Sequence, residues 1–392
     1  MSKIIYKSPQ GETREISTNS DIAIPKQKIV TFFDLTKDKL YLYLNKVFET
    51  GLIPVLYDKN IKSINSSIKS MDFDSLPNNT AAIFFTSGTT GKPIGVLKSK
   101  ENITHELDVL KDMFLPYNFE QVIVTVPLVH IYGFLTGVLL PKALDIDVIL
   151  KEEFIPHELI ELGGNKRTLC ITNPVFLKAL NRLSLKNKYK NITFLSSTGK
   201  LEIDIIKSLN KKLDSEIYQL FGSTETGGIA YKINTEELWK PLPSVDIGKN
   251  GSNLVVCSPF LSHHAIVNEL IEFKSPFITT DIVELVGDSF RLIGRESEII
   301  KVSGKRISIL EIESLLEKSK YIDEALVKLG QSIHLYKDEY LDISIVSSLT
   351  LEDIRKEVKR VLHYNYININ IRSTIVLIEQ IEKTHMGKKL RG

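Results

Sequence analysis

The order of apolar and polar positions predicts a chain in which strands and helices alternate. Apolar runs of strand length occupy residues 29–33, 52–56 and 81–85, and they are rich in β-branched and aromatic residues. Residues 40–48, and a segment that begins after Ser99, instead repeat apolar residues at helical spacing. This alternation is typical of α/β layers.

The order of elements changes towards the C-terminus. After residue 300, Ser308 and Glu311 have the spacing of a capping box, which predicts the start of a helix. Thr350 is expected to cap a second helix. Strands are expected at residues 324–329, 340–346 and 373–378. With 392 residues, the chain is long enough for two domains, each with a core of its own.

Composition and charge exclude several classes of protein. The net charge is +2 and the basic residues are scattered, so we expect no nucleic-acid partner. Cys170 and Cys257 are too few for a disulfide framework or a zinc site, which suits a reducing cytosol. Residues 1–10 lack the apolar core of a signal peptide, and the apolar segment 134–140 is too short to cross a bilayer. We therefore expect a cytoplasmic protein without a membrane span.

A loop rich in hydroxyl groups and glycines follows the expected strand at residues 81–85. Its glycines allow the backbone to approach a ligand closely, and successive N–H groups beside hydroxyls and one lysine form a cradle for a polyphosphate. The loop consists of Thr86, Ser87, Gly88, Thr89, Thr90, Gly91 and Lys92. It is not the nucleoside-triphosphatase loop, which has four residues between its first Gly and its Gly-Lys pair, and a Ser or Thr directly after the Lys. A plain surface connection is the alternative interpretation.

A second Gly-rich turn, at residues 218–228, combines an aromatic ring, a hydroxyl and a carboxylate. Phe221 can stack on a base, the Thr224 hydroxyl can bond a phosphate oxygen, and Glu225 offers a hard oxygen ligand suited to Mg²⁺. Together with residues 86–93, this aromatic-Gly-x-Thr-Glu turn resembles the acyl-adenylate-forming superfamily. That superfamily includes acyl-CoA synthetases, nonribosomal-peptide adenylation domains and luciferases.

The resemblance extends in the family's order from about residue 81 to the C-terminus. The further matches lie at residues 127–133, 198–201, 277–281, 290–307 and 382–389. Four positions depart from the usual pattern: Thr280 replaces Gly, Ser297 replaces Asp or Lys, Glu298 replaces Asp, and Glu382 replaces Pro. The region before residue 81 is unusually short for the family.

The resemblance implies roles for named residues. Binding of the nucleotide falls to residues 86–92, to Gly199, Lys200 and Leu201 beside adenine, to Phe221, Gly222 and Ser223, and to Asp281 and Arg295 near ribose. The carboxylate substrate is bordered by His130, Tyr132, Gly133, Asn173 and Thr198. A side chain added at Gly133 is expected to fill that pocket. The catalytic residues are Thr224, Glu225 (also the metal ligand) and Lys388, and Ser297 marks a hinge.

The implied protein has an α/β fold with a large N-terminal domain of layered sheets and helices, residues 1–295. A small, mobile α+β domain, residues 296–392, carries Lys388. The implied reaction uses ATP and Mg²⁺ to convert a carboxylic acid to acyl-AMP, and a thiol then displaces AMP. The thiol belongs to coenzyme A or to the phosphopantetheine arm of an acyl carrier protein.

Two questions stay open at this level. An aryl or fatty acid is favoured over an amino acid, because residues 130–132 offer no acidic partner for an amino group. The alternative to a ligase is a catalytically inactive nucleotide-binding homologue that acts as a sensor or an assembly partner. A nicotinamide enzyme is disfavoured, because no Gly-x-Gly-x-x-Gly follows a strand.

Overall fold

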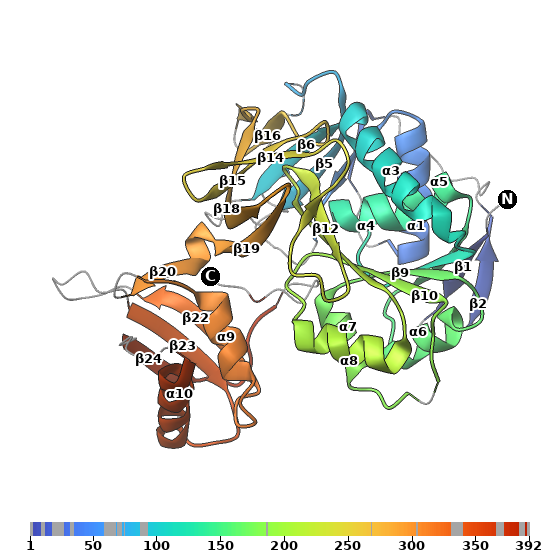
Figure 1. Cartoon of the computed structure of the whole chain (residues 1–392). Helices are drawn as coiled ribbons and strands as arrows, with labels where there is room; N and C mark the ends of the chain where they lie inside the picture. Colours follow the sequence, from blue (N-terminus) through green and yellow to red (C-terminus); the bar gives the residue numbers. More distant parts are fainter. Residues whose placement is uncertain are drawn as a thin grey trace. The chain divides into compact units, whose positions relative to one another are not determined.

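The computed structural model divides the chain into two compact units (Figure 1). It describes residues 3–8, 12–17, 27–31, 35–58, 68, 73, 75–86, 93–185, 187–267, 269–302, 305–330, 340–365, 372–383 and 389, with the backbone alone at 297, 299–302, 305–306, 340 and 372. The first unit comprises residues 1–248, 255–277 and 286–290. The second comprises residues 249–254, 278–285 and 291–392.

A nine-stranded sheet forms the centre of the first unit. Its order is β13-β12-β11-β10-β9-β7-β8-β1-β2. The strands are β1 (Ile4–Lys7), β2 (Thr13–Ile16), β7 (Gln121–Val124), β8 (Asp147–Lys151), β9 (Thr168–Thr172), β10 (Ile192–Ser196), β11 (Ile217–Ser223), β12 (Gly227–Ile233) and β13 (Lys240–Pro241). The six strands from β11 to β1 run parallel, and the outer pairs are antiparallel. The carboxyl ends of the six parallel strands therefore lie along one edge.

A second, six-stranded sheet has the order β17-β16-β6-β5-β4-β3. Its strands are β3 (Ile29–Thr31), β4 (Ile53–Leu56), β5 (Thr80–Thr86), β6 (Ile94–Ser99), β16 (His264–Ile266) and β17 (Leu270–Glu272). Strand β5 is almost entirely buried because its residues from Ala82 to Phe85 are apolar. It ends at Thr86, where the predicted phosphate loop begins. The strands expected at residues 52–56 and 81–85 are confirmed, and the one expected at 29–33 is confirmed for residues 29–31, because 32 and 33 lie outside the described residues.

Helices cover both faces of the nine-stranded sheet (Figure 1). They are α1 (Lys37–Glu49), α3 (Lys100–Phe114), α4 (Ile131–Phe134), α5 (Leu140–Leu144), α6 (Pro156–Gly163), α7 (Pro174–Asn181) and α8 (Ile203–Leu213). Helices α6, α7 and α8 share one apolar core with the sheet. Helix α3 begins where expected, because the Ser99 side chain accepts a hydrogen bond from the N–H of Asn102 at 3.1 Å. None of the helices within the described residues is long and apolar enough to cross a membrane.

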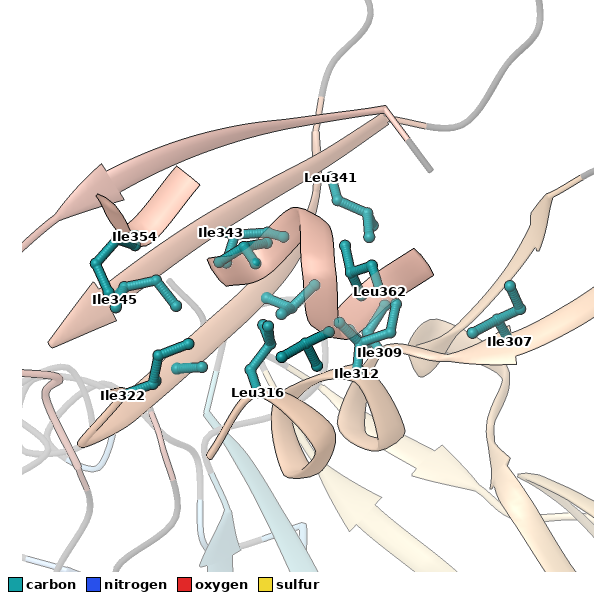
Figure 2. Close-up of a cluster of buried hydrophobic side chains, with 14 residues drawn as sticks. Ile307, Ile309, Ile312, Leu316, Ile322, Leu341, Ile343, Ile345, Ile354 and Leu362 are labelled. Atoms are coloured by element: carbon teal, nitrogen blue, oxygen red, sulfur yellow. The ribbon is translucent and has the colours of Figure 1, made fainter. Parts of the chain in front are cut away.

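The second unit contains a three-stranded sheet with two helices packed on it. The sheet consists of β22 (Glu324–Gly330), β23 (Tyr340–Val346) and β24 (Arg372–Leu377), and the helices are α9 (Ile309–Glu317) and α10 (Leu351–Asn365). Figure 2 shows isoleucine and leucine side chains from both helices and from the sheet meeting in one cluster. The α+β arrangement expected after residue 300 is confirmed.

One local expectation in this region is wrong. Ser308 stands at the start of α9, but its side chain forms no capping bond with the described residues, so the capping box with Glu311 is absent. Farther along α9, the carboxylate of Glu313 accepts the N–H of Val327 at 2.7 Å. That contact joins α9 to β22 directly.

The remaining strands form a four-stranded sheet and a hairpin. The sheet has the order β14-β15-β18-β19, from β14 (Asp246–Asn250), β15 (Asn253–Cys257), β18 (Phe277–Val286) and β19 (Ser289–Arg295). The hairpin pairs β20 (Ile299–Val302) with β21 (Lys305–Ser308).

Candidate active site

Four segments with predicted site residues leave the same edge of the nine-stranded sheet. Strands β7, β9, β10 and β11 are parallel neighbours. They lead respectively into residues 125–133, Asn173, residues 197–201 and residues 224–226. Ligands of open α/β sheets bind at this edge, beyond the carboxyl ends of the strands. The fold thus collects residues that are up to about a hundred positions apart in the sequence.

Strands β11 and β12 form a hairpin whose turn holds Thr224 and Glu225. Ser223 and Thr226 close the turn from inside: their hydroxyls are 3.1 Å apart, and the Ser223 N–H donates to the Thr226 hydroxyl at 3.0 Å. Gly227 has φ +70°, and a Cβ at Gly222 would lie 2.2 Å from the Gly227 carbonyl oxygen. The turn therefore requires both glycines.

The side chains of Thr224 and Glu225 are half-buried at the tip of this hairpin. Neither forms a hydrogen bond or a salt bridge with the residues that the structure describes. The backbone of Glu225 is held firmly, because its carbonyl accepts the N–H of Ser262 at 2.8 Å and Nζ of Lys98 at 3.3 Å. A fixed backbone whose side-chain oxygens have no hydrogen-bond partner among the described residues is suited to receiving a ligand.

Lys98 is a fully buried lysine on β6, with 1% of its surface exposed. Its Nζ also donates to the Phe260 carbonyl at 2.7 Å. Burial lowers the pKa of Lys98 to about 8, although the carboxylates of Glu106 and Glu225 favour its charged form. Glu106, on α3, is buried too, and burial raises its pKa. Its Oε1 accepts the N–H of Gly228 at 2.8 Å.

Aromatic side chains surround the base of the hairpin. The Phe221 ring lies 5.3 Å from Trp239 and 5.7 Å from Phe290, measured between ring centroids. Lys232 extends over the Trp239 ring, with Nζ 4.7 Å from its centroid. Burial and the charge of Lys200 lower the pKa of Lys232. Phe221 thus packs against two other aromatic rings of the protein, and its stacking on adenine stays a prediction.

The residues predicted to border the carboxylate are mostly engaged in holding the fold together. The Tyr132 hydroxyl, buried in α4, donates to the carbonyls of Thr172 at 3.1 Å and of Leu195 at 2.5 Å, so it joins the ends of β9 and β10. Burial raises its pKa well above the ordinary value. The Asn173 side chain caps α7 by accepting the Phe176 N–H at 2.9 Å. His130 is half-buried at the start of α4.

Gly133 requires a correction. A Cβ at this position would lie 2.0 Å from the carbonyl oxygen of Pro127. The space beside Gly133 is filled by backbone, so an added side chain would displace the turn rather than fill a pocket. The expectation that substitution here narrows a substrate pocket is therefore wrong.

The turn after β10 contains a strained residue. Thr198 has φ +76°, a conformation that β-branched residues rarely adopt, and its side chain is exposed. Ser197 fixes the turn by donating its hydroxyl to the Leu220 carbonyl on β11 at 2.8 Å. Leu201 is buried in the apolar core, whereas Gly199 and Lys200 are exposed. Because its side chain is buried, Leu201 can offer only its backbone to the adenine that is predicted beside this turn.

In the second unit, the structure brings Asp281 and Arg295 together. Asp281 lies on β18 and is 6% exposed, and Arg295 ends β19. Nε of Arg295 lies 3.2 Å from Oδ1 of Asp281. Asp281 also has its N–H bound to the Thr279 hydroxyl at 3.1 Å. The two residues predicted to bind ribose therefore form one charged pair.

Several predicted residues lie outside the described part of the chain. They are Ser87, Gly88, Thr89, Thr90, Gly91, Lys92 and Lys388, together with the side chain of Ser297. Lys389, the residue after Lys388, is described. Its Nζ donates to Oε1 of Glu317 and to the Ala325 carbonyl, both at 2.6 Å, and so connects this residue to α9 and β22.

Residues 25–257, more than half of the chain, match the model of the AMP-binding enzyme family. The chain belongs to this family. The matched range contains the hairpin with Thr224 and Glu225 as well as the loop at residues 86–92. The resemblance to adenylate-forming enzymes that the motifs indicated is confirmed.

Curated relatives of this AMP-binding enzyme are CoA ligases by name. It is 25% identical to a putative long chain fatty acid-CoA ligase, VraA, from Staphylococcus aureus, covering 80% of this chain and 70% of the relative. It is also 25% identical to 2-succinylbenzoate–CoA ligase from Listeria monocytogenes, covering 80% and 69%.

Solved structures have the same fold. O-succinylbenzoate coenzyme A synthetase from Bacillus subtilis, in complex with AMP, superposes with a TM-score of 0.76 at 17% identity, covering 93% of this chain and 86% of that one. ATP-bound MatB from Rhodopseudomonas palustris superposes with a TM-score of 0.74 at 16% identity, covering 99% and 94%. The expected α/β fold is thereby confirmed.

The residues of the hairpin fit a magnesium ion that arrives with a nucleotide. Mg²⁺ keeps several waters and is usually held by one or two carboxylates plus substrate phosphates. Glu225 supplies one such carboxylate from an anchored backbone. Within the described residues, no group of three or more His, Cys, Asp or Glu side chains could hold a metal ion.

Lys98, Glu106 and Thr226 contribute to the site but were not singled out from the sequence. Two of them break the local pattern. Lys98 interrupts an apolar strand, and Glu106 lies on the apolar face of its helix, between Ile103 and Leu110. A charged residue at a core position is a signal that a buried partner exists.

Proposed function

We propose that this AMP-binding enzyme is an ATP-dependent acid–thiol ligase. It forms an acyl-AMP and then an acyl thioester. The observation that carries the proposal is the β11–β12 hairpin, which presents Thr224 and Glu225 from an anchored backbone at the ligand-binding edge of the sheet. The CoA ligases among its relatives support the same reaction class.

The first half-reaction is a phosphoryl-group displacement. A carboxylate oxygen of the acid attacks the α-phosphorus of ATP, and the bond to the bridging oxygen of pyrophosphate breaks. Such a reaction needs charge neutralisation and positioning more than acid–base catalysis. In the second half-reaction, a thiol sulfur attacks the acyl carbon, its proton is lost to solvent, and AMP leaves.

The protein supplies the positive field from several places. We assign residues 86–92 to the phosphates, the Thr224 hydroxyl to a phosphate oxygen, and Lys388 to the charge that develops during adenylation. Asp281 and Arg295 are assigned to ribose. Mg²⁺, when bound beside Glu225, neutralises phosphate charge. Ser297 is placed at a hinge between domains of residues 1–295 and 296–392.

The acid is proposed to be a fatty or aryl acid. Two relatives support this class, because their names specify a long chain fatty acid and a succinylbenzoate. Coenzyme A is the proposed acceptor for the same reason, and a carrier protein is the alternative. The cytosol is the proposed location, because Cys170 and Cys257 are both free thiols.

ATP–pyrophosphate exchange tests the first half-reaction. The full chain is assayed with fatty acids of graded length, aryl acids and amino acids, with and without Mg²⁺. Exchange is expected with a member of the first two classes and only with the metal. Glu225→Gln is the matched control, and it should need more Mg²⁺ for half-maximal exchange while unfolding at the parent temperature. Nucleotide binding without exchange for any acid would instead support the inactive homologue.

The acceptor is tested with the same activated acid. Coenzyme A and a phosphopantetheinylated carrier protein are supplied separately, and AMP release and thioester are measured together. Thioester with coenzyme A is expected. Transfer to the carrier protein alone would replace coenzyme A in the proposal without affecting the adenylation step.

A further inference from the structure

The hairpin turn is attached to the rest of the first unit by two buried charged residues of opposite sign. Lys98 lies on β6, the strand that leaves the predicted phosphate loop, and its Nζ reaches the carbonyls of Phe260 and Glu225 at 2.7 and 3.3 Å. Glu106 lies on the following helix, α3, and binds the N–H of Gly228 at 2.8 Å.

The hydrogen bonds of both residues go to backbone groups: Lys98 binds the carbonyl of Glu225 itself, and Glu106 binds the N–H of Gly228. Glu106 leaves little room at the neighbouring position, because a Cβ at Gly227 would lie 2.5 Å from Oε2 of Glu106. The Phe260 segment is fixed from the same helix: Asn102 donates to the carbonyls of Pro259 at 2.8 Å and Leu261 at 3.0 Å. The turn therefore has its backbone bound to β6, to α3 and to residues 259–262.

Burying two charges for general stability has no evident advantage here. An apolar pair of similar volume is often as stable as a buried ion pair, or more so, because removing charges from water is costly. The two charged residues are instead suited to fixing the position of a backbone segment, because hydrogen bonds from charged groups are stronger and more directional than apolar contacts. The position fixed in this case is that of the Glu225 backbone.

We propose that Lys98 and Glu106 are positioning residues that fix the hairpin turn relative to β6 and so set where the Glu225 carboxylate meets the metal–nucleotide complex. The inference rests on the proposed function for the role of Glu225. It adds two residues that touch neither substrate nor metal but decide the geometry between the phosphate-loop strand and the turn.

The test uses Lys98→Met, Glu106→Gln and the double variant. Either single change leaves the other charged side chain buried, whereas the double variant removes both of these buried charges and keeps an acceptor for the N–H of Gly228. It should therefore fold as the parent does, which unfolding temperature verifies. Hydrogen exchange of the ligand-free protein should be faster at residues 222–228 and 259–262 in the double variant. This readout needs no activity, so it is independent of the proposed reaction.

Kinetics give the second readout. The Mg²⁺ concentration for half-maximal pyrophosphate exchange should rise about tenfold in the double variant, the lower end of the loss seen when residues that orient a metal ligand are removed. The KM for the acid should stay unchanged. Lys37→Met is the matched control, because Lys37 is also buried and donates to a backbone carbonyl, that of Val124 at 2.7 Å, which does not belong to the hairpin.

The outcomes separate the two proposals. Parent-like hydrogen exchange and Mg²⁺ dependence in a folded double variant would overturn the positioning role. Equal changes in Lys37→Met would also overturn it, because the effect would then reflect loss of any buried lysine. Absence of exchange activity in the parent would refute the ligase, while the hydrogen-exchange comparison would still decide how the turn is held.

Discussion

At the scale of residues, the first unit is unusual in burying charged side chains inside its core. Lys37, Lys98 and Glu106 are 7%, 1% and 4% exposed. Charged residues are seldom fully buried unless they are paired or hydrogen-bonded. Each of the three has a backbone partner, at Val124, Phe260 and Gly228 respectively. The cost of burying the charge is visible in the pKa values.

Lys37 makes stability depend on pH near neutrality. Burial lowers its pKa to about 7, although Glu152 favours the charged form. Between that value and the ordinary lysine pKa, the unfolded chain binds a proton that the folded chain does not, so the free energy of unfolding rises with pH. One proton bound only by the unfolded chain changes the free energy of unfolding by at most about 1.4 kcal/mol per pH unit. Because Lys37 is still partly protonated near pH 7, Lys37→Met should reduce the rise between pH 7 and 8 by about 1 kcal/mol.

Urea unfolding of parent and variant at several pH values measures the effect. The window stays below pH 9, because burial raises the pKa of the Cys170 thiol and that group then acts in the opposite direction. Parallel curves for parent and variant would show that Lys37 keeps its proton when buried.

At the scale of elements, the site consists of turns that leave neighbouring strands. Two of these turns are fixed by hydrogen bonds to a neighbouring segment: the Ser197 hydroxyl donates to the Leu220 carbonyl on β11, and the Ser262 N–H donates to the Glu225 carbonyl. The turn after β10 is the strained one, with Thr198 at φ +76°. Strain of this kind is often retained at sites of function.

Replacing Thr198 by glycine should relieve the strain. A residue held in a sparsely populated backbone region lowers the stability of the folded state by about 1–3 kcal/mol. Glycine removes this strain, but its larger conformational entropy in the unfolded chain offsets part of the stabilisation. We expect Thr198→Gly to raise the free energy of unfolding by about 1 kcal/mol. The sequence predicts that this turn contacts adenine, so the KM for ATP should rise as well.

Ser244→Gly is the matched control, because Ser244 is exposed and has φ +66° in a different turn. It should stabilise the protein without changing the KM for ATP. A KM change of the same size in both variants would contradict a nucleotide role for the turn after β10.

At the scale of the whole molecule, the proposed function divides between two units. The larger contains the hairpin and the sheet edge, and the smaller has its own core of α9, α10 and a three-stranded sheet (Figure 2). Lys388 lies outside the described residues, and the proposal assigns it to the domain of residues 296–392. The proposal places Lys388 at the α-phosphate during adenylation only, in one of two domain orientations.

Lys388→Ala should separate the two half-reactions. Adenylation should fall by about two to three powers of ten, as for loss of one preorganised charge donor. Thioester formation from prepared acyl-AMP should be nearly unaffected. Single-turnover measurement of each step checks this, with Lys383→Ala as control, because Lys383 forms an exposed salt bridge with Glu324. Equal loss in both steps would mean that the domains do not alternate.

The sequence by itself determined the family, the fold class and the reaction class. The reason is that the informative groups lie within short segments. The cradle at residues 86–92 and the aromatic-Gly-x-Thr-Glu turn each carry their chemistry in five to seven consecutive residues, and periodicity reports secondary structure locally. The strands and helices expected from that periodicity were confirmed for the same reason.

Only the tertiary structure decided which distant residues form hydrogen bonds with the backbone at those motifs. Lys98 meets Phe260 and Glu106 meets Gly228 across more than a hundred positions, and no local pattern encodes such a pairing. Gly133 proved to contact the Pro127 carbonyl, and Tyr132 to join two strand ends, because packing fills the space that a motif leaves undefined. Side-chain identity sets which chemistry is available, whereas long-range burial and hydrogen bonding set where it is held.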